Sequence, residues 1–350
     1  MRVLHTEWSD GWGGQEIRII SEMEGVRERG VDVKLACREN SKIKEEALKR
    51  GFKVYTFPFK GNTDLKTFFG LRKLIKKEKI DIVNTHSGKD TWVGGLAAKS
   101  TGAKFIRTRH LSNRINPSRT NFINELADFI ITTGESIRKD MIKYNRIKPE
   151  KIMSIPTGID DEIFNPENYD KEKLREKFGL KKRVVIGNLG VLRNVKGQIY
   201  LVEAAKILAN KYSDLEFTIA GEGPKREFLE KEIEKLANFR LLGHQDAAEF
   251  LAAIDIFVLS SLNEGVPQSL MQALAMNVPS IATNVGSVRD LYNDNFLLIK
   301  PKSAEEIADA IESLLKNRNM FSDTRKFIVK NFSKKVMIDK ILRIYEKVLQ

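Results

Sequence analysis

The sequence is poor in the residue types that build disulfide frameworks and metal centres. Its 350 residues include one cysteine, Cys37, and four histidines. A single cysteine forms no disulfide framework and is typical of a reducing cytosol. None of the histidines pairs with another histidine or with the cysteine at metal-ligand spacing, so we expect no zinc site built on His5, His86, His110 or His244.

Further absences narrow the location and the chemistry. No run of 18 or more apolar residues occurs, so we expect no membrane-spanning helix. The chain starts with "MRVLHTEWSD", where Glu7 precedes any apolar core of a signal peptide, and we therefore expect a cytoplasmic protein. The sequence also contains neither an Asp-x-Asp triplet nor a Gly-x-Ser-x-Gly motif. These absences argue against a metal-held diphosphate built on that triplet and against a nucleophile elbow.

Positive charge is abundant and unevenly distributed. The net charge is +13, and residues 66–119 contain 13 Lys and Arg against three acids, Glu78, Asp81 and Asp90. Such a surplus suits nucleic acid, anionic lipid headgroups or a phosphorylated substrate, or it is a solvated lysine-rich surface. Nucleic acid is disfavoured because no recognisable binding motif occurs and the basic run shows no regular interleaving with aromatic stacking residues.

Apolar segments of strand length alternate with amphipathic helices, which predicts βαβ units around parallel sheets covered on both faces. The polar segment 165–183 separates two similar sets, so we expect two α/β halves with a hinge near residue 165. Helices are expected over 15–29, with Ile17, Ile20, Met23 and Val26 as the apolar face, and over 334–349. The expected strands are 2–6, 31–37, 52–58, 80–86, 103–110, 128–134, 151–158, 183–192, 215–221, 239–243, 256–261, 278–283 and 296–301.

Ligands of such sheets bind beyond the carboxyl ends of the strands, so the loops after the strands carry the candidate sites. The segment "SDGWGGQE" (9–16) follows the first strand, and a glycine-rich turn there usually lets backbone approach a phosphate. Asp32 lies at about the distance of the ribose-binding acid of a dinucleotide fold, but the third glycine of that fingerprint falls on Glu16. The loop therefore indicates a phosphate neighbour without a nicotinamide-binding motif.

The strongest local signal lies in residues 260–287. A strand there leads into a loop with Glu264, and a helix is expected over 268–275. The unpaired N–H groups and positive end of that helix, together with Ser269, would form an anion site.

Three other strand exits carry weaker signals. In "GNLGVLRNVKG" (187–197), Arg193 and Lys196 suit a diphosphate, because Arg binds it bidentately and Lys acts as a point charge. The glycines of "AGEGP" (220–224) and "LLGHQD" (241–246) allow either close approach to a ligand or a tight turn.

In their order and spacing, these segments resemble the motif series of the group-1, GT4-type retaining glycosyltransferases. The resemblance covers nearly the whole chain and implies the GT-B fold, with two Rossmann-like, doubly wound α/β domains that face each other across a cleft. It implies an N-terminal acceptor-side domain over 1–165, to which the helix 334–350 returns, and a nucleotide-sugar-binding domain over 166–333. The segments are "GWGG", "RTRH", "PTGIDDEIF", "GNLGVLRNVKG", "AGEGP", "LGHQD" and "EGVPQSLMQALAMNVPSIATNVGSVRDL".

The resemblance also implies roles for particular residues. Arg193 and Lys196 match the pair that neutralises the donor diphosphate, and Glu264 matches the first acid of the Glu-x7-Glu signature. His110 matches the histidine that lines the sugar site. The implied catalytic residues are His110, Arg193, Lys196 and Glu264; the donor-binding residues are Gly13, Gly14, Asn188, Gly190, Gly221, Gly243, His244, Gly265, Ser269, Leu270 and Gln272; the acceptor-side residues are Trp12, His86 and Arg109.

The sequence departs from the family pattern at several positions. Gln272 replaces the second signature acid, which weakens the contact to the ribose hydroxyls by roughly 1 kcal/mol. Asn277 replaces the usual glycine after the signature helix and is the next best residue for a left-handed turn. Ser287 and Asp290 replace a commoner glycine and glutamate.

The implied reaction moves a sugar from a UDP- or GDP-sugar to a hydroxyl, with retention and without a required metal or other cofactor. A glycan or lipid-linked acceptor at the inner face of the membrane, in cell-envelope polysaccharide or lipopolysaccharide biosynthesis, fits the basic region. Three alternatives stay open. They are a GT-B sugar-nucleotide epimerase, a nicotinamide oxidoreductase supported only by the first loop, and a non-catalytic nucleotide- or glycan-binding homologue.

Overall fold

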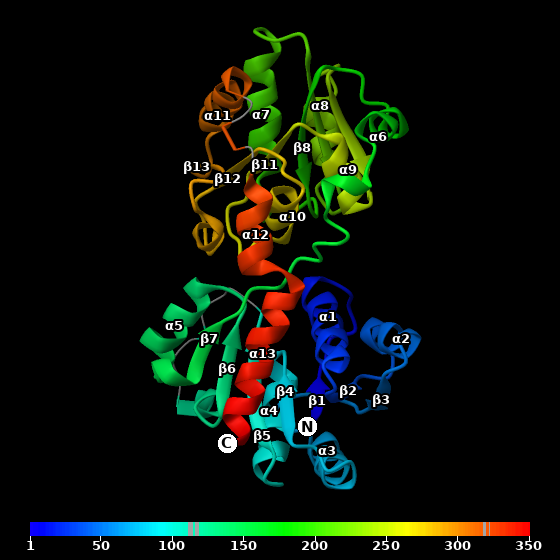
Figure 1. Ribbon diagram of the computed structural model, residues 1–350, viewed down its shortest axis with the longest axis vertical. Coiled ribbons are helices and arrows are strands. Elements are labelled where there is room, and N and C mark those ends of the chain that lie inside the picture. The colour runs from blue at the N-terminus through cyan, green and yellow to red at the C-terminus, as the bar shows by residue number, and fades with distance from the viewer. Residues whose placement is uncertain (111–114, 116–118, 318–319, 322) are drawn as a thin grey trace. The chain divides into compact units, whose positions relative to one another are not determined.

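The computed structural model describes residues 1–110, 115, 119–317, 320–321 and 323–350. The chain divides into two compact units, Met1–Gly158 with Lys334–Gln350 (unit 1) and Ile159–Ser333 (unit 2). Each unit contains one parallel sheet with helices packed on both faces (Figure 1). The expected α/β class is therefore confirmed for both halves of the chain.

The sheet of unit 1 has seven strands in the order β3-β2-β1-β4-β5-β6-β7. The order reverses between β1 and β4, so the carboxyl ends of these two strands form the switch point at which doubly wound sheets bind ligands. The strands are β1 (Arg2–Thr6), β2 (Asp32–Cys37), β3 (Lys53–Thr56), β4 (Ile82–Thr85), β5 (Lys104–Arg109), β6 (Phe129–Thr132) and β7 (Ile152–Ser154). The helices are α1 (Gly14–Glu28), α2 (Lys42–Lys49), α3 (Leu65–Lys77), α4 (Gly88–Lys99), α5 (Glu135–Asn145) and α13 (Lys334–Leu349), with short η1 (Arg119–Asn124) and η2 (Pro149–Lys151).

The sheet of unit 2 has six strands in the order β10-β9-β8-β11-β12-β13, and its switch point lies between β8 and β11. The strands are β8 (Val184–Leu189), β9 (Leu215–Ala220), β10 (Phe239–Gly243), β11 (Ile256–Leu259), β12 (Ser280–Thr283) and β13 (Leu297–Ile299). The helices are α6 (Lys171–Phe178), α7 (Gln198–Ala209), α8 (Arg226–Ile233), α9 (Ala247–Ala253), α10 (Gln268–Ala275), α11 (Ala304–Lys316) and α12 (Thr324–Phe332), with short η3 (Pro166–Asn168), η4 (Asn194–Lys196) and η5 (Val288–Leu291).

Every segment expected to be a strand contains one of these strands, and the helix expected over 268–275 is α10. The central strands are apolar runs buried on both faces, as covered parallel sheets require, whereas β3 at the edge of the unit 1 sheet is only partly buried. None of the described helices is both long enough and apolar enough to cross a bilayer.

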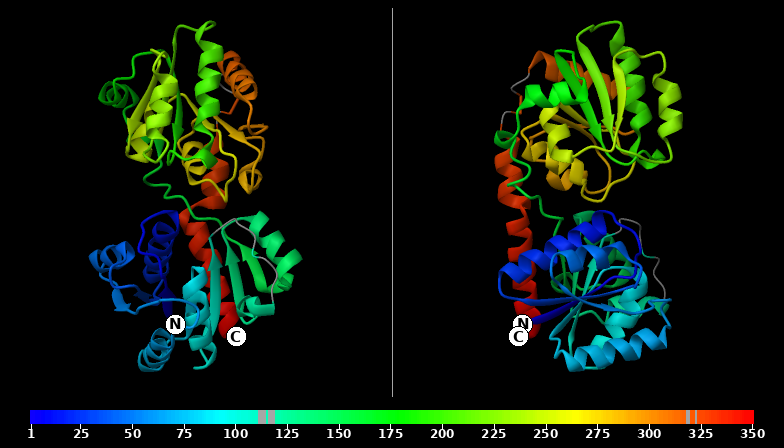
Figure 2. Two further views of the ribbon diagram at one scale, coloured as in Figure 1. Left: turned by 180° about the vertical axis from the view of Figure 1, so that it is seen from behind. Right: turned by 90° about the vertical axis from the view of Figure 1, so that its right-hand side faces the viewer.

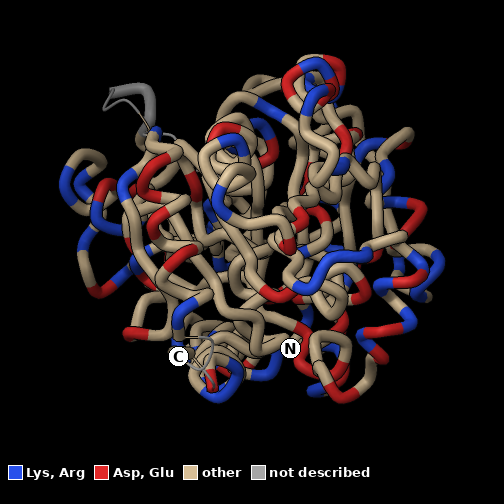
Figure 3. The backbone as a smooth tube through the Cα atoms, turned by 90° about the horizontal axis from the view of Figure 1, so that it is seen from above, with Lys and Arg blue, Asp and Glu red and all other residues tan. Residues whose placement is uncertain are grey.

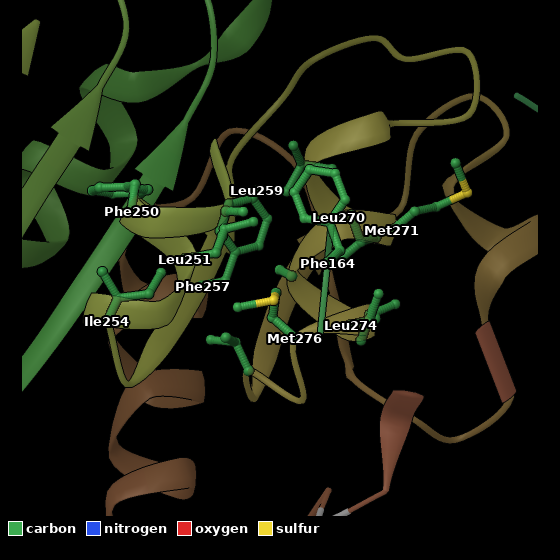
Figure 4. Close-up of a cluster of buried hydrophobic side chains, with 14 of the residues drawn as sticks. Phe164, Phe250, Leu251, Ile254, Phe257, Leu259, Leu270, Met271, Leu274 and Met276 are labelled. Atoms are coloured by element: carbon green, nitrogen blue, oxygen red, sulfur yellow. The ribbon is translucent and has the colours of Figure 1, made fainter. Parts of the chain in front are cut away.

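Helix α10 is anchored in a core on one face of the unit 2 sheet. Leu270, Leu274 and Met276 lie among Phe164, Phe257 and neighbouring apolar side chains (Figure 4). From Leu270 onward every residue of α10 except Gln272 belongs to this core, so the position of the amino end of the helix is fixed by the core.

Helix α13 packs against α1 in unit 1, where both contribute to the same core (Figure 2). The contact is close, because a Cβ on Gly25 would lie 2.4 Å from the Ile338 side chain. A buried polar network replaces part of the expected apolar face of α1. The Tyr345 hydroxyl donates to Glu22 at 3.0 Å, and Arg18 Nη1 donates to Thr157 Oγ1 at 3.2 Å.

The expected face of α1 is therefore wrong at Ile17, which is 50% exposed, whereas Arg18 and Glu22 are fully buried. The helical spacing of apolar residues predicts that those residues face the core, and it cannot predict that a charged pair faces the core instead. Arg18 and Glu22 form an ion pair of 4.0 Å inside the core, and Glu22 also accepts the Asn84 amide at 3.1 Å.

Candidate active site

Two loops at the switch point of unit 2 bring together side chains that the sequence suggested independently. Lys196, after β8, forms an ion pair of 2.7 Å with Glu264, after β11. The Ser261 hydroxyl donates to the same Glu264 oxygen, Oε1, at 2.6 Å. Glu264 is only 8% exposed, so the lysine and the hydroxyl offset the cost of burying its charge.

Backbone contacts lock these two loops and the loop after β12. The Leu262 N–H donates to Val195 O at 2.8 Å, and the Ser260 hydroxyl donates to Lys196 O at 3.1 Å. Gly286 has φ +53°, and a Cβ there would lie 1.8 Å from Glu264 O. The position of Glu264 thus depends on Gly286, a residue that the candidate set omitted although it lies in the quoted "TNVGS" segment.

The three glycines expected at the exits of β8, β9 and β10 also lie together. Gly190 N–H donates to Ala220 O at 3.0 Å, and Gly221 N–H donates to Gly243 O at 2.7 Å. A Cβ on Gly221 would lie 2.0 Å from Gly190 O. Glycine at 221 is therefore explained by close approach of two loops, whether or not a ligand is bound. His244, the next residue after Gly243, is exposed.

Arg193 is exposed in the loop after β8 and has no ion pair among the residues that the structure describes. Asn188 has a different position from the ligand-facing one expected. It is buried, and its Nδ2 donates to Val258 O at 2.8 Å, so it ties β8 to β11 at the switch point.

The amino end of α10 lies beside these loops. Pro267 precedes the helix and supplies no side-chain cap, so the first N–H groups are left without that partner. Ser269 and Gln272 are half-buried on the first turns, and Leu270 is buried. Gly265 has no atom within 4 Å of a Cβ position, so no crowding within the chain explains glycine there.

At the switch point of unit 1, three histidines form one hydrogen-bonded row. His5 Nδ1 lies 2.8 Å from His86 Nε2, and His86 Nδ1 lies 3.0 Å from His110 Nε2. Burial lowers the pKa of His5 to about 3 and lowers the pKa values of the other two rings well below the usual value. The histidines do not stand at metal-ligand spacing in the sequence, and they meet here because the strand order β1-β4-β5 aligns residues that are far apart along the chain.

The row changes the interpretation of His86. It is 2% exposed and both of its ring nitrogens are engaged, so it lies behind His110 and does not itself face an acceptor. His110 is half-buried and is the outermost ring of the three.

Two carboxylates that the sequence analysis missed lie at the same switch point. Glu7 accepts the N–H groups of Trp8 and Ser9, each at 2.8 Å, and Asp90 accepts the Thr6 hydroxyl at 2.6 Å. Burial, and then the neighbouring Asp90, raise the pKa of Glu7 to about 8. A signal for Asp90 exists in the sequence, since Ser87 and Asp90 form the capping box of α4.

Replacing Glu7 with glutamine is expected to make the stability of the protein less sensitive to rising pH. In the native state Glu7 keeps its proton up to about pH 8, whereas the unfolded side chain loses it near pH 4.5. Stability of the wild type therefore falls as pH rises between these values, by up to about 1.4 kcal/mol per pH unit from this group. In urea denaturation at pH 5.5, 6.5 and 7.5, the free energy of unfolding of the variant should rise relative to that of the wild type at each step.

The exposed carboxylate Glu45 on α2 supplies the matched control, Glu45→Gln, which makes the same chemical change without burial. Parallel stability curves for Glu7→Gln and the wild type would contradict the assignment of a raised pKa to Glu7.

The loop before α1 is more acidic than its glycines suggested. Gly13 N–H donates to Glu16 Oε2 at 2.8 Å, so a carboxylate already occupies the amino end of α1. Neither Gly13 nor Gly14 is required by crowding, and Trp12 is 38% exposed. An anion that approaches this end of the helix meets the Glu16 carboxylate. Asp32 starts β2, at the amino end of that strand, so Asp32 itself does not lie at this site.

The basic stretch 66–119 does not form a single surface. Arg107 and Arg109 on β5 are buried at 5% and 9% exposure, and burial lowers the pKa of both guanidinium groups. Several of the exposed lysines lie on α3, where Leu65 and Phe69 are also 67% and 57% exposed. Figure 3 shows basic and acidic residues interspersed over the rest of the chain. Within the described residues, no three His, Cys, Asp or Glu side chains are grouped so as to hold a metal ion.

The sequence matches two family profiles that together span both units. Residues 170–335 match the family described as glycosyl transferases group 1, and residues 12–163 match glycosyltransferase family 4. The chain is similar to the UDP-Gal:alpha-D-GlcNAc-diphosphoundecaprenol alpha-1,3-galactosyltransferase of Escherichia coli. The two are 29% identical over 374 residues, covering 99% of this chain and 96% of that one.

Solved structures share the fold over the full length. A glycosyltransferase from Rickettsia africae ESF-5 has a TM-score of 0.89 at 22% identity, covering 100% of this chain and 98% of that one. Anabaena Alr3699/HepE in complex with UDP and glucose has a TM-score of 0.83 at 19% identity, covering 99% and 100%. From both family matches and this GT-B fold, it follows that the chain belongs to the group-1 glycosyltransferases of family 4 and is an enzyme of that class.

Proposed function

We propose that the enzyme transfers a sugar from a nucleoside-diphosphate sugar to a hydroxyl of a lipid-linked glycan, with retention at the anomeric carbon. The observation that carries the proposal is the switch point of unit 2. There Lys196 is held by Glu264 at 2.7 Å, Arg193 is exposed in the same loop, and the uncapped amino end of α10 lies beside them. A lysine, an arginine and the amino end of a helix can each stabilise the charge of a departing diphosphate.

The costly event in such a transfer is the departure of a diphosphate whose negative charge grows beside an oxocarbenium-like sugar. Arg193, Lys196 and the amino end of α10, worth roughly half a positive charge, would be aimed at that charge before reaction. Both bonds of Glu264 described above use Oε1, so Oε2 would accept a hydroxyl of the donor sugar. Attack from the face of the leaving group, with a phosphate oxygen taking the acceptor proton, needs no protein nucleophile.

The proposed donor is a UDP-sugar, held without a metal. The E. coli relative is named for UDP-Gal, and UDP is bound in the Anabaena structure of the same fold. Lys196 and Arg193 would supply the positive charge that a metal gives to other diphosphate sites. Gln272 would contact the ribose with one acceptor oxygen in place of the family's carboxylate.

The proposed acceptor is a lipid-linked glycan at the inner face of the membrane, as in cell-envelope polysaccharide biosynthesis. The name of the E. coli relative describes a diphosphoundecaprenol acceptor. On α3, Leu65 and Phe69 are exposed beside Lys66, Lys73 and Lys76, which suits an anionic lipid surface. The enzyme would therefore act as a peripheral protein on a cytoplasmic membrane surface.

Thermal unfolding with UDP-, GDP- and ADP-sugars, followed by transfer assays, tests the proposal. A UDP-sugar is expected to raise Tm, because a ligand at 100 times its Kd adds about 2.7 kcal/mol of stability. That sugar should then be transferred to a GlcNAc-diphospholipid acceptor, faster in anionic vesicles than in neutral ones, and the difference should shrink with added salt.

Other outcomes identify the alternatives. Conversion of the donor sugar without an acceptor indicates an epimerase, and binding without turnover indicates a non-catalytic homologue. Protection by a nicotinamide dinucleotide alone would instead favour an oxidoreductase.

A further inference from the structure

The row of histidines in unit 1 crosses three neighbouring strands. His5 lies on β1, His86 follows β4, and His110 follows β5, which are adjacent in the sheet. The His5 and His86 rings are stacked, with centroids 5.1 Å apart and planes 11° apart, and the His86 and His110 rings are 5.3 Å apart and tilted by 38°. Each ring is thus fixed by a ring from the next strand.

The three rings are neutral at ordinary pH. Burial is the main reason that their pKa values are low, and the guanidinium groups of Arg18 on α1 and Arg109 on β5 lower the pKa of His110 further. Asp90 on α4 accepts the His86 backbone N–H at 2.9 Å. A neutral imidazole carries one N–H and one lone pair, so a row of such rings must donate in one direction throughout.

The unpartnered end of the row sets that direction. His5 Nε2 is buried and has no hydrogen-bond partner among the described residues. A proton there would be an orphaned buried N–H, which is rarer in proteins than an unused acceptor. The proton of His5 therefore lies on Nδ1 and is donated to His86 Nε2. His86 in turn donates from Nδ1 to His110 Nε2, which leaves the proton of His110 on its own Nδ1.

We propose that His5 and His86 are positioning residues that hold His110 as the neutral Nδ1–H tautomer. His110 then offers a hydrogen-bond donor, and no positive charge, to the sugar that it contacts. A positively charged imidazolium would repel an oxocarbenium-like centre. A neutral donor binds a sugar oxygen without that repulsion. The contact between His110 and the sugar is the one that the family resemblance implies, and it rests on the proposed function, whereas the tautomer itself is a property of the resting protein.

Nitrogen-15 NMR of the histidine-labelled full chain tests the tautomer directly. His5, His86 and His110 are expected as Nδ1–H rings that do not titrate between pH 5 and 8. The signals of His244, which is exposed, serve as the reference for a histidine outside the row. An Nε2–H tautomer or a protonated ring at any of the three positions would overturn the proposal, whatever the enzyme transfers.

A pair of variants at His5 tests its use in catalysis. His5→Asn places an amide nitrogen near the position of Nδ1 and should keep the His110 tautomer and most of kcat. His5→Leu removes the donor, so His110 should populate both tautomers and kcat should fall about tenfold or more, with a smaller change in donor KM. Equal kcat for the two folded variants would refute the positioning role.

His110→Ala separates this inference from the proposed function. If that variant keeps full activity while the NMR signals of the wild type show the Nδ1–H row, the contact between His110 and the sugar is wrong and the tautomer row stands. If the variant is inactive and His5→Leu is fully active, the sugar contact stands and the positioning role of His5 fails.

Discussion

Replacing Arg193 with alanine is expected to lower kcat for sugar transfer by about 10²- to 10³-fold, the loss seen when one preorganised oxyanion donor is removed. Arg193 is exposed in the loop after β8 and has no ion pair among the described residues, so the fold does not depend on it. Its neighbour Lys196 is already held by Glu264. The guanidinium is therefore the group in this loop that is unpaired in the resting enzyme and would gain a partner as diphosphate charge develops.

Initial rates at saturating donor, together with the urea midpoint of each protein, measure the effect. Arg183→Ala is the matched control, because Arg183 is an exposed arginine directly before β8, at the opposite end of the same strand. Arg193→Lys should fall between the two, since it keeps the charge and loses the bidentate geometry. A kcat for Arg193→Ala within about twofold of the control would contradict the diphosphate assignment.

Much of the unit 2 site could be predicted from the sequence because its parts follow strands. Arg193, Lys196 and Glu264 stand just beyond β8 and β11, and the carboxyl ends of parallel strands meet at one edge. What the sequence left open was the strand order. Only the adjacency of β8 and β11 explains why residues 68 positions apart form an ion pair.

The unit 1 site was less predictable for the same reason. His5, His86 and His110 are spread over three strands, and nothing in their spacing shows that β1, β4 and β5 are neighbours. The sequence also did not indicate which arginines are buried. Arg107 and Arg109 belong to a basic stretch, and yet they lie in a covered strand. Local patterns fix element type well, whereas which charged side chains turn inward depends on partners far along the chain.

A second substitution with a large expected effect is Gly286→Ala, which changes no candidate ligand contact. Gly286 adopts φ +53°, which disfavours alanine, and the added Cβ would lie 1.8 Å from Glu264 O. Neither atom can move cheaply, because the Glu264 loop is tied to the β8 loop through Leu262 N–H and Val195 O. We expect a loss of roughly 2–4 kcal/mol in the free energy of unfolding.

Displacement of the Glu264 loop in Gly286→Ala is also expected to lower the rate of catalysis. Glu264 would shift relative to Lys196 and Ser261, and a misplacement of about 1 Å in such a site costs about 10²-fold in rate. The free energy of unfolding, measured with urea, and the initial rate should therefore both fall. In Arg193→Ala only the initial rate should fall. Gly61→Ala, in open space with an ordinary φ, is the control for the added methyl group. A Gly286→Ala enzyme with the stability and kcat of that control would show that the loop after β12 does not position Glu264.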